Sequence, residues 1–262
     1  MATESKFDLL ENGSKKAGLD PDPNLDLLPR YYRGEEYLSV LSPIDLQTFN
    51  KRIKVMCNKR DWLLESLEGK TILVTALIVD IVNSTKTVKK IPEELAGAYY
   101  QKFIEDTSNL IERYGGYVLK NVGDCVIGFF PSGKHMVENQ DKAVMCGLAM
   151  PDMIQYDLNP YLGAKKMPPI QCRISADFGS ANVVRVRSGD GYSAIDLFGS
   201  PMNSAAKIAR YAKPGQVLVG DDLFWQLSDC VDFEFKLVNR WDPIGRNNYP
   251  VYIAMRKSLG RR

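Results

Sequence analysis

The chain has 262 residues, of which 45% are hydrophobic, and its 34 basic and 32 acidic side chains leave a formal net charge of +2. This hydrophobic content is enough for a substantial core, so the composition excludes a chain that is disordered throughout. The balanced charge creates no field that would favour nucleic acid or an anionic membrane as a partner.

The cysteines and the histidine narrow the possible chemistry further. Five widely spaced cysteines without a Cys-x-x-Cys pair favour buried thiols in a reducing compartment over a disulfide framework or a zinc site. The chain has a single histidine, His135, which argues against a Ser-His-Asp triad and against a multi-histidine metal centre. No apolar run approaches the roughly 20 residues of a membrane helix, and the first residues lack a signal-peptide core. We therefore expect a soluble, cytoplasmic protein.

The N-terminal region, residues 1–68, is expected to lie outside the main domain. Residues 1–40 are polar and rich in proline and glycine, which predicts a loosely ordered arm with one apolar patch at Leu25–Tyr32. Pro43 begins a helical stripe that extends to Met56, which predicts a short helix. Because no sensor domain is evident, this region is the candidate for regulation or for stabilising a dimer.

The main domain, residues 69–255, begins with two strand-rich stretches that each carry one carboxylate. The stretch Thr71–Thr85 contains an apolar, β-branched strand that ends near Asp80. An amphipathic helix follows from Pro92 to Gly115. Residues 116–130 then predict a hairpin with Gly123 and Asp124 at its tip. Two carboxylates placed where strands meet turns are a candidate site for a hard divalent cation.

The rest of the domain mixes helices and strands. Further helices are predicted at about residues 139–157, 202–209 and 221–227. Further strands are predicted at residues 170–178, 181–186, 216–219, 233–238 and 249–255. Pro151 should bend the first of these helices, and residues 160–169 and 196–200 are expected to be loops. This pattern predicts an α+β fold with one sheet, followed by a basic tail at residues 256–262.

Five segments, in this order, resemble the catalytic domain of the class III nucleotidyl cyclases, the adenylate and guanylate cyclase family. They read VDIVNST, GGYVLKNVGD, RISADFG, DLFGSPMNSAAKIA and AKPGQVLVG. The resemblance covers residues 70–254 and implies a ferredoxin-like βαββαβ core with additional strands and helices. It also implies a head-to-tail homodimer with sites at the interface.

The resemblance assigns the two carboxylates to metal binding. It implies that Asp80 and Asp124 bind two divalent cations, Mg²⁺ or Mn²⁺, with the carbonyl of Ile81 as a possible further ligand. In cyclisation the ribose 3′ oxygen attacks the α-phosphorus of a nucleoside triphosphate and pyrophosphate leaves, and two such cations assist both events. Without the other motifs, both acids would be interpreted as turn caps.

Phosphate and base contacts are also implied by the family pattern. The backbone N–H groups of Asn83, Ser84 and Thr85 align with a phosphate-binding turn, although ordinary helix capping explains the same residues. Lys120 and Asp196 align with the pair that recognises adenine at N1 and at the 6-amino group. Guanylate-specific members tend to carry a glutamate and a cysteine or similar residue there, so the pair favours ATP. The alternative is a surface lysine and an N-cap aspartate.

Two positions depart from the family pattern. Asn203 matches the asparagine that orients the ribose, but Lys207 replaces the arginine that stabilises charge on the α-phosphate. Lysine keeps the charge and loses the planar fork, for which Arg210 on nearly the same helical face is a partial substitute. The lysine that binds the terminal phosphates is absent from the segment WDPIGRNNYPVYI, in which Arg246 is the nearest cation.

These assignments favour a homodimeric adenylate cyclase that converts ATP to 3′,5′-cyclic AMP and pyrophosphate. The alternatives are a pyrimidine or guanylate cyclase of the same family, or a catalytically weak nucleotide-binding regulatory module.

Overall fold

The computed structural model describes residues 59–133, 139–187, 193–228, 233–241 and 249–257, together with residues 189 and 191. Residues 59–66 form a helix that precedes the first strand. The remaining elements, in chain order, are β1 (Thr71–Ile81), α4 (Ser84–Val88), α5 (Glu93–Arg113), β2 (Tyr117–Val122), β3 (Cys125–Ser132), α6 (Asn139–Met153), the π-helix η3 (Ile154–Leu158), α7 (Asn159–Ala164), β4 (Cys172–Arg187), β5 (Ser193–Gly199), α8 (Ser200–Ile208), the 3₁₀ turn η4 (Ala209–Tyr211), β6 (Val217–Gly220), α9 (Asp221–Phe224), β7 (Phe233–Trp241) and β8 (Tyr249–Arg256).

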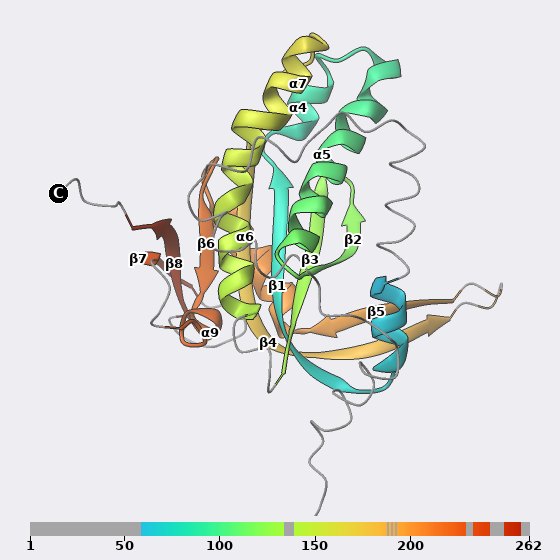
Figure 1. Ribbon diagram of the computed structural model, residues 1–262, viewed down its shortest axis with the longest axis vertical. Coiled ribbons are helices and arrows are strands. Elements are labelled where there is room, and N and C mark those ends of the chain that lie inside the picture. Colours follow the sequence, from blue (N-terminus) through green and yellow to red (C-terminus); the bar gives the residue numbers. More distant parts are fainter. Residues whose placement is uncertain are drawn as a thin grey trace, which may run out of the picture.

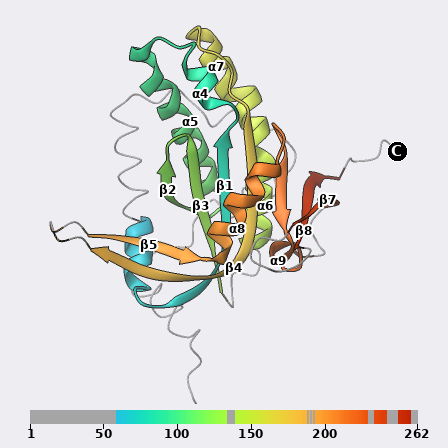
Figure 2. The ribbon, with the colours of Figure 1, turned by 180° about the vertical axis from the view of Figure 1, so that it is seen from behind.

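Eight strands of the described part of the chain form one mixed sheet. Its order is β2-β3-β1-β4-β6-β8-β7, and β5 pairs with the outer half of β4. The order β2-β3-β1-β4, with α5 and α6 as crossover helices, is the ferredoxin-like βαββαβ arrangement, which confirms the predicted fold class. Helices α5 and α6 lie in front of the sheet in Figure 1, and α8 lies in front of it when the molecule is turned (Figure 2).

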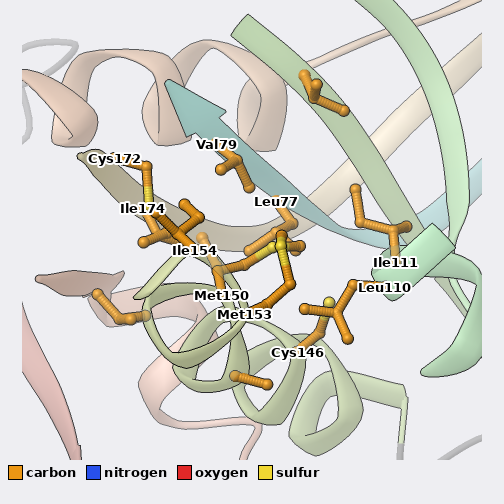
Figure 3. Close-up of a cluster of buried hydrophobic side chains, with 14 of the residues drawn as sticks. Leu77, Val79, Leu110, Ile111, Cys146, Met150, Met153, Ile154, Cys172 and Ile174 are labelled. Carbon is orange, nitrogen blue, oxygen red and sulfur yellow. The ribbon is translucent and has the colours of Figure 1, made fainter. Parts of the chain in front are cut away.

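The centre of the sheet is covered on both faces. Leu77 and Val79 of β1 belong to the main core with α5 and α6, whereas Ala76 and Ile78 pack against α8. Alternate residues of a strand point to opposite faces, so a strand buried on both sides is apolar throughout. Figure 3 shows the main core, in which the side chains of β1 meet those of α5, α6 and β4. No helix among the described residues is long and apolar enough to cross a membrane.

Several predicted elements are confirmed with small shifts of their ends. The long amphipathic helix is α5, the predicted hairpin is β2 and β3 with residues 123–124 in the turn, and the two closing strands are β7 and β8. The predicted helices beginning at residues 202 and 221 correspond to α8 and α9. The arm at residues 1–40, the predicted helix near Pro43, His135 and Arg246 lie outside the described residues.

Three predicted boundaries are wrong. Residues 172–187 form one strand rather than two, because β4 continues through Gly179, whose missing side chain leaves room for Ser200 and Pro201 of α8. Residues 196–199 are not a loop but the end of β5, where Leu197 pairs with Val183 and is buried.

The third wrong boundary concerns the helix after β3. It does not end at residue 157 but continues through η3 and α7 to Ala164, so the predicted loop at 160–169 is wrong over its first half. Pro151 lies inside α6 without ending it. Pro160 lies in the first turn of α7, a position that tolerates a missing N–H group.

Asp177 on β4 is a buried carboxylate that ties β4 to β8. It is 1% exposed, and the hydroxyl of Tyr249 on β8 lies 2.8 Å from both carboxylate oxygens. The N–H group of Phe178 donates to Oδ1, and the N–H group of Asp222 donates to the Tyr249 hydroxyl. Burial raises the pKa of Asp177 to about 7, although the hydrogen bond from Tyr249 opposes the shift.

This pKa predicts how stability depends on pH. Because the pKa of Asp177 in the folded state lies above its ordinary value of 3.8, the folded protein binds more protons than the unfolded chain between about pH 4 and 7. The free energy of unfolding should therefore fall as pH rises through this range. We expect Asp177→Asn to flatten the decrease in melting temperature between about pH 5 and 8.

Glu112 provides an independent comparison, because burial raises its pKa to about 7 at a separate position on α5. Glu112→Gln should remove a second contribution to the decrease in the free energy of unfolding with rising pH. Parallel curves of melting temperature against pH for the wild type and Asp177→Asn would contradict the prediction.

Candidate active site

Strand pairing brings Asp80 and Asp124 together. Asp80 lies at the end of β1, opposite Cys125 on β3, and Asp124 is the residue before Cys125 in the β2–β3 turn. Gly123 in this turn has a φ of +62°, which glycine adopts without strain. The N–H group of Ile81 lies 3.3 Å from the carbonyl of Asp124 and donates to it. The antiparallel pairing of β1 with β3 therefore places both carboxylates at the same end of these two neighbouring strands.

Arg173 on β4 is a third member of this group, which the sequence did not predict. It lies opposite Asp80 in the register, and its Nε and Nη2 atoms are each 2.6 Å from Oδ2 of Asp80. Burial raises the pKa of Asp80, Arg173 lowers it, the neighbouring Asp124 raises it, and the net change is upward. Arg173 is the first residue of the segment RISADFG, and its place in that family-like segment was the only sign in the sequence that it could belong to the site.

The donor set fits a hard divalent cation. Asp80 and Asp124 supply carboxylate oxygens, and Mg²⁺ is commonly held by one or two carboxylates together with water and substrate phosphates. Cys125 does not compete as a thiolate ligand, because burial and then the two carboxylates raise the pKa of its thiol to about 12. Among the described residues there is no cluster of three or more His, Cys, Asp or Glu side chains that could hold a metal ion.

The turn after β1 is shaped by its backbone. Asn83 adopts a left-handed conformation with φ 56° and precedes α4, whose N-terminus has no side-chain cap. The N–H groups of Lys86 and Thr87 donate to the carbonyl of Asn83. Capping by Ser84 or Thr85, the ordinary explanation of this turn, is therefore not what the structure shows. A phosphate contact at Asn83, Ser84 and Thr85 stays a prediction.

Lys120 and Asp196 form an ion pair although they are 76 positions apart in the chain. Lys120 lies on β2 and Asp196 on β5, and the ammonium group contacts Oδ2 of Asp196. Oδ1 of Asp196 accepts a hydrogen bond of 2.9 Å from the N–H group of Leu197. Gly199 is the N-cap of α8, so Asp196 does not cap this helix. The pair thus places a donor and an acceptor side by side at the surface.

Asn203 and Lys207 lie one turn apart on α8, so their side chains point to the same side of the helix. Asn203 is exposed and Lys207 is half-buried. Helix α8 packs on Ala76 and Ile78 of β1, and strand alternation places Asp80 on that same face of the sheet. Arg210 is exposed in η4, just beyond Lys207.

Comparison with protein families gives a direct result. The sequence profile of the family described as the adenylate and guanylate cyclase catalytic domain matches residues 69–255. The chain therefore belongs to this family. It is a nucleotidyl cyclase catalytic domain of that family. No curated protein matches the chain.

Solved structures agree with this fold. The adenylyl cyclase CyaB from P. aeruginosa has a TM-score of 0.65 and 19% identity over 74% of this chain and 98% of its own. The guanylate cyclase domain of RhGC from Catenaria anguillulae, in complex with GTP, has a TM-score of 0.63 and 18% identity over 72% of this chain and 100% of its own. A rhodopsin-guanylyl cyclase core with converted specificity, in complex with ATPαS, has a TM-score of 0.63 and 20% identity over 72% of this chain and 98% of its own. The similar structures thus include enzymes for both purine nucleotides.

Proposed function

We propose that this chain is an adenylate cyclase that converts ATP to 3′,5′-cyclic AMP and pyrophosphate. The observation that carries the proposal is the contact between Lys120 and Asp196. Adenine presents an acceptor at N1 and an amino donor at position 6, which complement an ammonium donor and a carboxylate acceptor. Guanine in the same position presents an N–H donor at N1 and a carbonyl acceptor at position 6. The donor Lys120 would then face a donor, and the acceptor Asp196 would face an acceptor.

The residues around Asp80 support the chemical step. Asp80 and Asp124 would hold two divalent cations, which when bound activate the ribose 3′ oxygen and neutralise the leaving phosphates. Asn203 orients the ribose, and Lys207 brings positive charge to the α-phosphate. Arg173 adds a half-buried guanidinium beside Asp80, and its planar fork suits phosphate oxygens. Arg173 is therefore a candidate for the terminal phosphates among the described residues, and Arg246 lies outside them.

A homodimer with sites at the interface is part of the proposal. In it, one protomer supplies Asp80 and Asp124, and its partner supplies the base, ribose and α-phosphate contacts of β2, β5 and α8. Exposed apolar side chains support such an assembly, because Phe198 on β5 is 49% exposed and Val184 and Val186 on β4 are exposed nearby. Two-fold symmetry then creates two equivalent sites.

A competition between ATP, GTP, CTP and UTP tests the proposal. With Mn²⁺ present and all four nucleotides at equal concentration, cyclic AMP should be the main product, identified by chromatography and mass. A main product of cyclic GMP would assign the chain to the guanylate branch. A cyclic pyrimidine nucleotide would instead support the pyrimidine alternative, and either result would refute the choice of ATP.

Lys207 motivates the second candidate, a nucleotide-binding module with weak turnover. An arginine here would hold the α-phosphate with two N–H groups instead of one point charge. We expect Lys207→Arg to raise kcat by about tenfold, the effect of one additional charged hydrogen bond in the transition state, with little change in KM. Steady-state kinetics with Mn²⁺ and ATP measure both constants.

Lys213→Arg is the matched control, because it makes the same change at an exposed lysine just beyond η4 and should leave kcat within about twofold. If the wild type and Lys207→Arg both bind ATP and neither forms cyclic nucleotide, the chain is a binding module rather than a cyclase.

A further inference from the structure

Strand β2 contains one β-bulge immediately before Lys120. Val118 pairs with Gly128, and Lys120 pairs with the next residue along β3, Ile127, so Leu119 is an extra residue in β2. A bulge interrupts the ladder, bends the strand and re-aims the neighbouring side chains. The position of the Lys120 ammonium group therefore depends on how this bulge is held.

The bulge also decides the face on which Lys120 lies. The side chain of Leu119 is buried in a cluster with Leu64 and Leu67, which come from the segment before β1. Ile127, the partner of Lys120, packs against the same cluster. In a regular strand Leu119 and Lys120 would point to opposite faces, whereas here both lie on the face covered by residues 59–66.

Arg60 holds the bulge from outside the sheet. Its Nη1 atom donates a hydrogen bond of 2.6 Å to the carbonyl of Leu119, 59 positions away in the chain. Its Nε and Nη2 atoms lie 2.8 and 2.6 Å from Oδ1 of Asp61, which fixes the direction of the guanidinium. A charged donor gives a stronger hydrogen bond than a neutral one, and Arg60 is only 22% exposed.

The same helix contacts the strands around Asp196. Leu64 and Leu67 pack with Val183 of β4 and Leu197 of β5, the residue after Asp196. In Figures 1 and 2 the helix of residues 59–66 lies beside β5. One short helix thus touches both strands that carry the ion pair.

We propose that Arg60 is a positioning residue for base selection, which holds the bulge at Leu119 and thereby directs Lys120 toward Asp196. This inference rests on the proposed adenine-reading role of Lys120 and Asp196. Arg60 does not contact the nucleotide. Its effect should appear in the discrimination between bases and not only in the stability of the domain.

The test uses the full chain and three variants. Arg60→Gln removes the charged donor, and Asp61→Asn removes the carboxylate that orients it. Arg185→Gln is the matched control, because Arg185 is also 22% exposed and pairs with Glu65 of the same helix at 3.6 Å and with Glu68 just after it at 2.9 Å, without touching β2. For each protein, the ratio of kcat/KM for ATP and GTP is measured together with the ratio of the two equilibrium dissociation constants.

Arg60→Gln should lower the ATP-to-GTP ratio about tenfold, which at 1.4 kcal/mol per factor of ten is the size of one hydrogen bond from a charged donor. Asp61→Asn should lower the ratio less, and Arg185→Gln should keep the wild-type ratio. Hydrogen exchange of the backbone amides in β2 should become faster in Arg60→Gln and not in Arg185→Gln.

Unchanged ratios in an active Arg60→Gln protein would overturn the inference, whatever its melting temperature. If Arg60→Gln does not fold, an unchanged ratio in Asp61→Asn overturns it. A wild type that forms no cyclic nucleotide would instead refute the proposed function, and the ratio of dissociation constants would then decide the role of Arg60. A wild type without any preference for ATP, in turnover or in binding, would overturn both.

Discussion

Asp124→Asn is expected to lower cyclase activity about a thousandfold while leaving the fold intact. The carboxylate is one of the two that would hold the cations, and their loss removes stabilisation of several kcal/mol from the transition state. The backbone of the turn does not depend on this side chain, because Gly123 provides the positive φ and the Asp124 carbonyl accepts from Ile81. Initial rates with Mn²⁺ and ATP, together with a calorimetric titration of Mn²⁺, measure the effect.

Asp80→Asn provides an informative comparison with Asp124→Asn. It should abolish activity to a similar extent, but it also weakens the contact with Arg173 and leaves a half-buried guanidinium without its charged partner. We therefore expect a lower melting temperature for Asp80→Asn than for Asp124→Asn.

Asp152→Asn is the control for both variants, because Asp152 of α6 pairs at the surface with Arg256 of β8, a strand that β4 and β6 separate from β1. It should keep wild-type activity. An Asp124→Asn protein that retains activity within tenfold of the wild type would contradict the assigned role of this carboxylate.

Mixing two inactive variants is expected to restore about a quarter of the wild-type activity. In the proposed dimer, Asp124 and Lys207 of one site come from different protomers. Random assembly of Asp124→Asn with Lys207→Ala makes about half of the dimers mixed, and each mixed dimer has one intact site of two. The two variants are co-expressed with different affinity tags. The unfractionated mixture should show the quarter, and the purified doubly tagged dimer should show about half of the wild-type activity.

Two outcomes would contradict the shared site. A purified mixed dimer without activity would show that Asp124 and Lys207 act within one protomer. Activity of Lys207→Ala by itself, close to that of the wild type, would show that Lys207 is not needed at the α-phosphate. A mixture of Asp124→Asn with Asp80→Asn is the control that should stay inactive, because both changes affect the same half of the site.

Local patterns in the sequence were sufficient to predict the central elements of the fold. The apolar run of β1, the helical periodicity of α5 and the turn at Gly123 depend on neighbouring residues, and the structure confirms all three. The resemblance to the cyclase family, and not the local pattern, implied metal binding by Asp80 and Asp124, and this role stays a prediction. Local reasoning failed for β5 and for residues 160–164, where pairing with β4 and continuation of a helix override the loop signals.

Only the tertiary structure decided which distant residues meet. Arg173 reaches Asp80 across 93 positions of the chain, because β4 pairs with β1 in one particular register. Arg60 reaches Leu119 because β2 contains one extra residue, and Lys120 reaches Asp196 because β5 folds back along β4. Periodicity reveals the face and the type of an element, whereas strand register and the packing of a helix on a sheet depend on contacts that no local pattern records. The sequence by itself therefore determined the family, and the fold determined which side chains surround Asp80 and Asp124.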